Sequence, residues 1–495
     1  MTAPTPTPLL SALIKAAQRE HAAFYAPGHK QGQGISRLLA ALLGEQVFRA
    51  DLPELPELDN LFSPAGPIQQ AQQLAAETFG AEATFFLANG STCGIEAAIL
   101  ATCLPGDKVL VPRNAHRSVL SALILSGAHP VYLAPIYDAR WDLAYGVTPE
   151  QVELALAKHP SIRAVVVVSP SYHGVCTDIA AIAARVHQRS GILIVDEAHG
   201  PHLSFHEQLP MGAIAGGADL VIQSTHKVLA ALTQASMLHV QGPRVDRDRL
   251  RQALQITQST SPNYLLLASL DAARQQMAVE GHALMDQTLR IAQQVRSQLT
   301  ALAPLQTLDS EHVSPLSSGF QLDLTRLTVD VSALGITGFA ADELLHEQLG
   351  ATAELPTLRQ LTFILSLGNI PADGDRLVSA LKALIAKATL DPQPLVAIAA
   401  DEPLPAPALT EPPLSPRDAF FAPSQTVAIT QAAGHLSADI LCPYPPGIPV
   451  LLPGERITPE AIAYLQHIQA AGGMITGGPD SGLQALRIVD TRSNR

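Results

Sequence analysis

The sequence predicts an α/β fold built on a mainly parallel β-sheet. Short apolar runs that suit buried strands, at residues 109–111, 164–168 and 192–195, alternate with stretches of helical spacing. Ser169 follows the second run and Asp196 follows the third. This alternation is typical of a parallel sheet that helices cover on both faces, and such sheets bind ligands beyond the carboxyl ends of their strands. We therefore expect a ligand site at that edge.

The remaining elements follow from the same patterns. Helical spacing predicts helices at residues 9–24, 68–79, 94–102, 118–125, 149–157, 178–189, 247–254, 265–301, 338–349 and 459–470. Further strands are expected at residues 84–87, 130–133, 220–223, 320–325 and 361–367. We predict five parts: an N-terminal segment (1–60), a large domain (61–310), a small α+β domain (311–390), a Pro/Ala-rich linker (391–416) and a C-terminal domain (417–495).

Composition excludes several classes of protein. The chain has 495 residues, of which 47% are hydrophobic and 15% charged, and no apolar run is long enough to cross a membrane. The formal net charge of −13 argues against a nucleic-acid partner, which would require clustered Lys and Arg. The first residues lack the basic start and apolar block of a signal peptide, so we expect a cytoplasmic protein. The four scattered cysteines form no CxxC pair, and we expect neither disulfides nor a metal site.

A lysine and an aspartate at two strand ends suit one cofactor. Lys227 follows the strand at 220–223, and Asp196 follows the strand at 192–195. A lysine in such a place is an ordinary solvated side chain unless burial or a nearby cation makes its amine nucleophilic. Pyridoxal phosphate (PLP) accounts for both residues, because its aldehyde requires an amine and its ring nitrogen an anion. We therefore predict a PLP site.

Several motifs together resemble the Orn/Lys/Arg decarboxylase family. They are Tyr-Ala-Pro-Gly-His-Lys at 25–30, Asn-Ala-His-Arg-Ser at 114–118, Ser-Pro-Ser-Tyr-His-Gly at 169–174, Asp-Glu-Ala-His at 196–199 and Ser-Thr-His-Lys at 224–227. The resemblance runs from about residue 20 to about residue 310 and resumes at 443–449 and 453–455. It implies a large domain of the PLP-dependent transferase-like, fold type I class, with a mainly parallel seven-stranded sheet.

The resemblance also implies which residues hold the cofactor. The loop before the helix at 94–102 offers backbone N–H groups to a phosphate, although a Ser/Thr helix cap without a ligand has the same pattern. By resemblance, His116 stacks on the pyridine ring, and Ser259 and Thr260 reach the phosphate of a neighbouring subunit. The full set of expected cofactor residues is Gly90, Ser91, Thr92, His116, Asp196, His199, Ser224, His226, Lys227, Ser259 and Thr260.

The expected reaction is decarboxylation of lysine, arginine or ornithine to a polyamine precursor. Loss of CO2 leaves a carbanion, and one acid or base supplies only about 3–5 kcal/mol of the needed barrier reduction, so a cofactor is required. Lys227, His226, Asp196 and His116 are the expected catalytic residues. Either Lys227 or His226 could return the proton to Cα. The sequence leaves this choice open.

Fewer residues indicate the substrate and the oligomeric state. A distal ammonium or guanidinium requires a carboxylate, for which Glu354 and Glu455 are the candidates, and either could equally be a surface acid. The first motif begins near the N-terminus, without the wing domain of the large inducible bacterial decarboxylases. The resemblance therefore implies a homodimer with its active site at the interface, or a tetramer, and disfavours a decamer.

Two alternatives stay open. The same fold also serves aminotransferases and carbon–sulfur lyases, and aminotransferases clamp the α-carboxylate with an arginine of the small domain, for which Arg359 is the candidate. Release of a keto acid in place of CO2 would identify that chemistry. A non-catalytic PLP-binding protein is the other alternative, although it would have no need to keep both Lys227 and Asp196.

Overall fold

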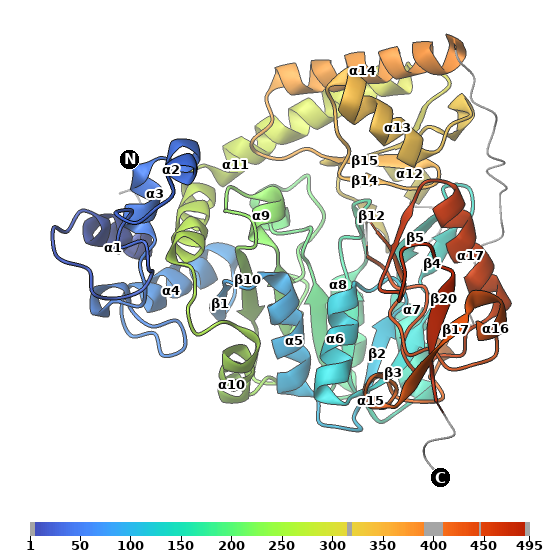
Figure 1. Cartoon of the computed structure of the whole chain (residues 1–495), viewed down its shortest axis with the longest axis horizontal. Helices are drawn as coiled ribbons and strands as arrows, with labels where there is room; N and C mark the ends of the chain where they lie inside the picture. The colour runs from blue at the N-terminus through green and yellow to red at the C-terminus, as the bar shows by residue number, and fades with distance from the viewer. Residues whose placement is uncertain (1–4, 314–318, 391–408, 445–446, 491–495) are drawn as a thin grey trace.

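The centre of the molecule is an eight-stranded sheet. The structure, a computed structural model, describes residues 5–313, 319–390, 409–444 and 447–490. The strand order is β1-β10-β9-β8-β6-β2-β3-β16 (Figure 1). The strands are β1 (Ala83–Leu87), β10 (Ser236–Val240), β9 (Leu220–Gln223), β8 (Ile192–Asp196), β6 (Ile162–Val168), β2 (Lys108–Pro112), β3 (His129–Leu133) and β16 (Leu409–Thr410).

The sheet is mainly parallel. The five neighbours from β9 to β3 pair in parallel, whereas β10 is antiparallel to both β9 and β1. β1 therefore runs in the same direction as those five. β16 adds an eighth, antiparallel strand beside β3. The predicted α/β class with a mainly parallel sheet is confirmed.

Side chains of each strand alternate between two apolar cores. Leu193 and Val195 of β8 lie in one core, and Ile192 and Ile194 lie in the other. This is the two-residue period of a strand that is buried on both faces. Helices α4 (Pro67–Phe79), α7 (Pro149–Lys158) and α8 (Ile179–Gln188) contribute to the first core. Helices α5 (Gly90–Thr102), α6 (Arg117–Ser126) and α10 (Arg247–Thr257) contribute to the second.

One long helix, α11 (Tyr264–Thr300), connects two domains. Its first part, from Leu267 to Leu289, packs in the core of the large sheet, and its last part, from Ile291 to Leu299, packs in the small-domain core. That second core covers a four-stranded antiparallel sheet in the order β11-β13-β15-β14. Its elements are β11 (Gln306–Thr307), β13 (Arg326–Asp330), β14 (Leu355–Pro356), β15 (Gln360–Ile364), α13 (Gly338–Leu344) and α14 (Pro371–Leu390).

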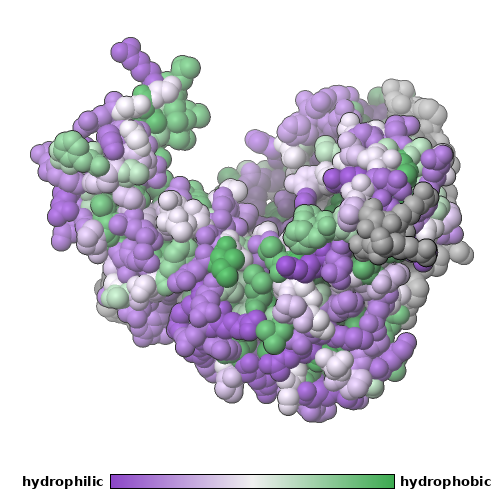
Figure 2. Space-filling model, turned by 60° about the horizontal axis from the view of Figure 1, so that its bottom comes forward, coloured by the Kyte–Doolittle hydropathy of each residue, from purple (hydrophilic) through white to green (hydrophobic). Residues whose placement is uncertain are grey.

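The start of the chain docks on the same long helix. Helix α1 (Pro8–Ala17) packs against α11 and α4. The backbone N–H groups of Leu9 and Leu10 donate to the Asp271 carboxylate at 2.9 and 3.2 Å. Helices α2 (Arg37–Leu43) and α3 (Glu45–Ala50) follow, and α2 buries none of its residues. Figure 2 shows this N-terminal part as an arm that projects at the upper left, with hydrophobic surface beside its hydrophilic tip.

The C-terminal part forms its own small core. It contains α15 (Pro416–Phe421), β17 (Ser424–Ala428), α16 (Ile429–Ala432), β18 (Cys442–Tyr444), α17 (Pro459–Ala470), β19 (Met474–Thr476) and β20 (Ala485–Val489). β17 pairs with β20, and β18 pairs with β19. Residues 391–408 of the predicted linker lie outside the described residues. The next two residues, Leu409 and Thr410, form β16 and pair with β3.

Most expected elements are present, with differences at particular places. The first predicted helix ends at Ala17, short of residue 24. The strand expected at 320–325 is only β12 (Gln321–Leu322), and it pairs with β7 (Val175–Cys176). β10, β13 and α14 were not predicted. None of the helices in the described ranges combines the length and apolar composition that crossing a bilayer requires.

Candidate active site

The catalytic candidates gather at the carboxyl ends of the central strands. Asp196 is the last residue of β8, and Lys227 lies in the short helix α9 (Thr225–Val228) directly after β9. Gly90 and His116 follow β1 and β2 in the chain. Because these strands run in one direction, their ends meet at one edge of the sheet. The edge expected from the sequence thus carries the candidate residues.

The Lys227 amine lies in a buried and crowded place. Its Nζ is 3.0 Å from Nε2 of His199 and 5.8 Å from the centre of the Tyr172 ring. Burial lowers the pKa of Lys227, the charges of Asp196 and Glu354 oppose this shift, and the charge of Arg326 adds to it. A lysine with a lowered pKa keeps more of its amine in the neutral, nucleophilic form. This is the state that covalent catalysis requires.

Asp196 is a buried carboxylate next to that lysine. It is 6% exposed and accepts a hydrogen bond from the backbone N–H of Ala198 at 3.1 Å. Burial raises the pKa of Asp196, and the charge of Lys227 opposes the shift. Each residue therefore lies within the electrostatic reach of the other. The pair provides an amine and an anion on one site, which fits the two ends of a pyridoxal ring.

The start of α5 has the features of a phosphate cradle. Gly90 begins the helix at a φ of +78°, and no side chain caps the helix at Asn89. The first N–H groups of an uncapped helix are available to an anion. Ser224 donates its hydroxyl to the Ser91 hydroxyl at 2.8 Å, which joins this helix to the segment that carries Lys227. Thr92 lies exposed in the same turn.

Three histidines surround the lysine. His116 caps α6, and Ser118 donates its backbone N–H to the His116 Nδ1 at 3.2 Å. Burial and the nearby Lys227 lower the pKa of His116 to about 4, so its ring is neutral at pH 7. His199 is also held neutral by burial, which lowers its pKa well below the usual value, and no described residue forms a hydrogen bond with its Nδ1. His226 is half-buried, and burial lowers its pKa as well.

The hydroxyl-rich loop lies beside the same cradle. Ser259 and Thr260 are exposed, and Ser259 donates its backbone N–H to the Asn89 side chain of its own chain at 3.4 Å. The preceding Gln258 accepts the backbone N–H of Ala88 at 2.9 Å. The loop is therefore anchored at the phosphate cradle of its own subunit. Its reach towards a second subunit stays a prediction.

The two candidate substrate carboxylates have different surroundings. Glu354 is exposed at the start of β14, and its charge affects the pKa values of both Lys227 and Tyr172. Glu455 is half-buried and forms an ion pair with Arg113 at 3.2 Å. Of these two carboxylates, Glu354 is the one whose charge acts on the lysine, and it forms no ion pair within the described residues.

Two residues of this site were not predicted. The Tyr172 ring lies 4.8 Å from the His199 ring. Tyr172 belongs to the Ser-Pro-Ser-Tyr-His-Gly motif at 169–174. Arg326 is fully buried and donates Nη2 to the His199 carbonyl at 2.7 Å, while its Nε and Nη1 have no partner in the part of the chain that the structure describes. No motif marks Arg326 in the sequence. The arginine that was considered, Arg359, instead pairs with Asp330 at 3.1 Å.

A separate cluster contains potential metal ligands. His206, Glu207 and His282 present ligand atoms within 4.8 Å of one another. However, the backbone N–H of Gln208 already donates to Nδ1 of His206 at 3.2 Å, and His282 pairs with Glu207 at 3.0 Å. None of these residues belongs to the predicted site. We therefore assign this cluster no role in the catalytic site.

The chain is similar to a known family over most of its length. The model of the Orn/Lys/Arg decarboxylase major domain matches residues 7–325, and the model of the family's C-terminal domain matches residues 405–479. An arginine decarboxylase of Bacillus subtilis is 37% identical over 98% of both chains. One of Bacillus anthracis is 38% identical over 98% of this chain and 97% of the relative.

Solved structures show the same fold. Lysine decarboxylase A from Pseudomonas aeruginosa superposes with a TM-score of 0.83 at 25% identity, over 98% of this chain and 80% of that one. The Francisella novicida lysine decarboxylase LdcF gives a TM-score of 0.81 at 23% identity, over 98% and 81%. An alanine–glyoxylate aminotransferase from Nostoc covers 66% of this chain and 89% of its own at a TM-score of 0.53, with 17% identity.

Proposed function

Because the chain belongs to the Orn/Lys/Arg decarboxylase family and is an amino-acid decarboxylase, we propose that it removes the α-carboxylate of arginine to give agmatine, with PLP held at Lys227. The observation that carries the proposal is the buried Lys227 amine, 3.0 Å from His199 and within reach of the Asp196 charge. Arginine is the first choice because relatives named arginine decarboxylase are 37–38% identical over nearly the whole chain.

The residues at the strand ends fit PLP group by group. Lys227 supplies the amine, Asp196 the anion for the ring nitrogen, and the uncapped start of α5 the donors for the phosphate. The neutral His116 ring can lie flat against the pyridine without adding a charge. When bound, PLP supplies an electron sink for the pair of electrons that CO2 leaves at Cα.

Proton transfer falls to the lysine and its neighbours. A group exchanges protons well when its pKa lies near the working pH, and burial brings Lys227 closer to that range. His199 Nε2, at 3.0 Å, orients the amine and can accept its hydrogen. Lys227 is therefore our first candidate for protonating Cα, and His226 is the second, because its ring is half-buried in the same turn of chain.

Glu354 is the proposed partner of the substrate's distal charge. A guanidinium pairs best with a carboxylate in bidentate geometry. Glu354 lies exposed beside the lysine, where it can meet a cation that enters from solvent. Glu455 is already paired with Arg113, so we give it the role of joining the C-terminal part to the large domain.

We also propose a homodimer that buries the N-terminal arm. Leu38 and Leu42 on α2 are 85% and 77% exposed, and Phe24 is 94% exposed. Such exposed apolar side chains on the N-terminal arm, where Figure 2 shows hydrophobic surface, indicate a surface that a second protein covers. A second copy of this chain would also bring its Ser259 and Thr260 towards the phosphate, as the resemblance implies.

A substrate comparison tests the function. CO2 release is measured from arginine, lysine and ornithine side by side with PLP present, together with the formation of agmatine and of any keto acid. We expect arginine to give the highest kcat/KM and no keto acid to form. A preference for lysine or ornithine would overturn the substrate, and keto acid without CO2 would overturn the reaction.

A further inference from the structure

A cleft lies where three parts of the chain meet. It encloses about 1090 Å³ of empty space, part of which is open to solvent. Asp142 and Tyr172 line it from the large domain, Phe339 and Leu358 from the small domain, and Pro443 and Ile468 from the C-terminal part. Lys227, Asp196 and Glu354 are not among the lining residues. The cleft is thus a neighbour of the catalytic edge, with which it shares Tyr172, and Asp142 is a polar group of the cleft alone.

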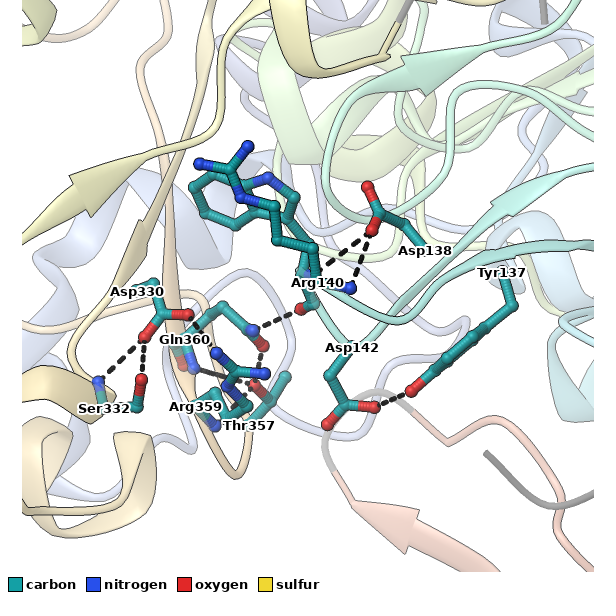
Figure 3. A network of polar contacts seen from close by, with 10 residues as sticks. Tyr137, Asp138, Arg140, Asp142, Asp330, Ser332, Thr357, Arg359 and Gln360 are labelled. Carbon is teal, nitrogen blue, oxygen red and sulfur yellow. Dashed lines mark hydrogen bonds and ion pairs between the residues drawn. The ribbon is translucent and has the colours of Figure 1, made fainter. Parts of the chain in front are cut away.

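Asp142 is the acidic group of this cleft, and Arg113, which also lines it, is paired with Glu455 at 3.2 Å. Asp142 lies at the start of the hairpin strand β5 (Leu143–Gly146), which pairs with β4 (Ile136–Asp138). Its carboxylate accepts the Tyr137 hydroxyl, and Figure 3 shows the two side chains pointing at one another. Burial raises the pKa of Asp142, while the Tyr137 hydrogen bond and the charge of Arg359 lower it. A carboxylate in such a place is stabilised by a cation.

The protein does not provide that cation by direct contact. Within the described part of the chain, no Lys, Arg or His nitrogen lies within 4.0 Å of the Asp142 carboxylate. Arg359, the nearby arginine, is held by Asp330 at 3.1 Å, as Figure 3 shows. One face of the Asp142 carboxylate therefore stays available to a ligand.

A second acceptor lies in the same cleft. Asn114 is 5% exposed, and its buried Oδ1 has no hydrogen-bond partner among the described residues. A buried oxygen without a donor costs free energy until a donor reaches it. The lining also contains apolar side chains, Leu358 and Ile468 among them. Asp142 and Asn114 thus offer two oxygen acceptors in a cleft that is partly apolar.

We propose that this cleft binds a small linear amine with a hydrogen-bond donor at each end, such as a diamine or an aminoguanidine-type chain, with one cationic end on Asp142. A molecule of this class brings a cation for Asp142, a donor for the Asn114 oxygen and an apolar chain for side chains such as Leu358 and Ile468. The inference goes beyond the proposed reaction, because it stands on the cleft's own residues. It also gives the protein a second place for the chemical class that its reaction produces.

Binding experiments on the PLP-loaded enzyme test the site. Agmatine, putrescine and cadaverine are titrated by calorimetry at fixed ionic strength, and the visible absorbance of the lysine-bound cofactor is followed in parallel as a report on the catalytic site alone. We expect Asp142→Asn to weaken calorimetric binding by at least about tenfold and to leave the absorbance titration unchanged. Asn tolerates the φ of +52° at this position, so the backbone is preserved.

Two further variants make the result decisive. Ala144→Leu narrows the cleft from β5 without removing a charge, and it should weaken the same calorimetric event. Glu354→Gln should change the absorbance titration and the calorimetric signal that follows it, and should leave unchanged the calorimetric event that Asp142→Asn weakens. Calorimetric binding that survives both Asp142→Asn and Ala144→Leu, or that is lost in Glu354→Gln, would place the amine in the catalytic site and overturn the inference. Absence of any calorimetric binding beyond that site would overturn it as well.

Discussion

The catalytic edge and the three-part cleft lie side by side and are built in opposite ways. At the edge, Asp196 and Lys227 sit at the ends of neighbouring parallel strands of one sheet, and polar contacts such as Ser224 to Ser91 tie the segments together. In the cleft, Asp142 and Asn114 line the same space as residues of two other parts of the chain. Within the described residues, Asp142 forms no ion pair and the Asn114 Oδ1 has no donor. The edge is therefore fixed before a ligand arrives, whereas the cleft is completed by its ligand.

The largest effect is expected at the edge. Lys227→Ala should abolish the visible absorbance of the bound cofactor and lower kcat/KM by at least about 10³-fold, because no other amine has this position. Absorbance spectra and CO2 release measure the two effects. Lys227→Arg is the matched control, since it keeps the charge without a nucleophilic amine and should also be inactive. Turnover by either variant would show that the edge does not depend on this lysine.

The next effect concerns how the C-terminal part is attached. A Cβ at Gly454 would lie 2.0 Å from the Leu414 carbonyl oxygen, and the glycine has a φ of +86°. Gly454→Ala should therefore destabilise the protein by about 3 kcal/mol or more, through clash and strain together. Urea unfolding measures the change. Gly350→Ala, with a φ of +70° and no atom within 4 Å, is the control and should cost only about 1 kcal/mol.

A smaller effect separates the two carboxylates. Glu354→Gln should raise the KM for arginine by about 10- to 100-fold, because a charge-assisted contact is lost. Steady-state kinetics with arginine measure it. Glu347→Gln, an exposed change nearby, and Asp142→Asn in the cleft should leave this KM unchanged. An equal rise in Asp142→Asn would mean that the edge and the cleft form one substrate site, and the comparison would fail.

The smallest effect tests the rigidity beneath the edge. His239 is buried between Thr84 and Gln223, at 2.8 and 3.0 Å, and burial lowers its pKa to about 3. The unfolded chain takes up a proton below about pH 6.5 and the folded one does not, so stability falls with pH below that value. Because of this histidine alone, the free energy of unfolding should be about 2 kcal/mol lower at pH 5 than at pH 8.

Unfolding at the two pH values checks this prediction. His239→Asn should show a smaller loss of stability between pH 8 and pH 5 than the wild type. His435→Asn, which replaces an exposed histidine, should retain the full loss. An identical pH dependence in His239→Asn and wild type would show that this buried network does not resist protonation.

Sequence reasoning worked where function is encoded locally. The apolar run of β8 ends in Asp196, so strand, buried surface and carboxylate are all visible within five residues. The short β13 and β10 were missed, although all their residues are buried, because neither stands out as a simple apolar run. The helix at 371–390 has an amphipathic pattern but was not predicted. It runs directly into the Ala/Pro-rich segment, whose composition is typical of a linker.

The parts that could not be predicted depend on tertiary contacts. Arg326 opens β13 in the small domain, yet its guanidinium meets the His199 carbonyl of the large domain. The cleft combines Asn114, Asp142, Leu358 and Ile468, which are separated by long stretches of sequence. No periodicity or motif relates such residues. Their association follows only from the packing of the three parts.

The docking of α1 has a consequence for how the protein is made. The backbone N–H of Leu9 donates to the carboxylate of Asp271, which lies 262 residues later in the chain. At a synthesis rate of about 5–20 residues per second, the first helix waits roughly 13–50 seconds on the ribosome before its acceptor has been translated. During that time the apolar side of α1 has no native partner from α11. Nascent chains of this enzyme should therefore engage holding chaperones through their first residues.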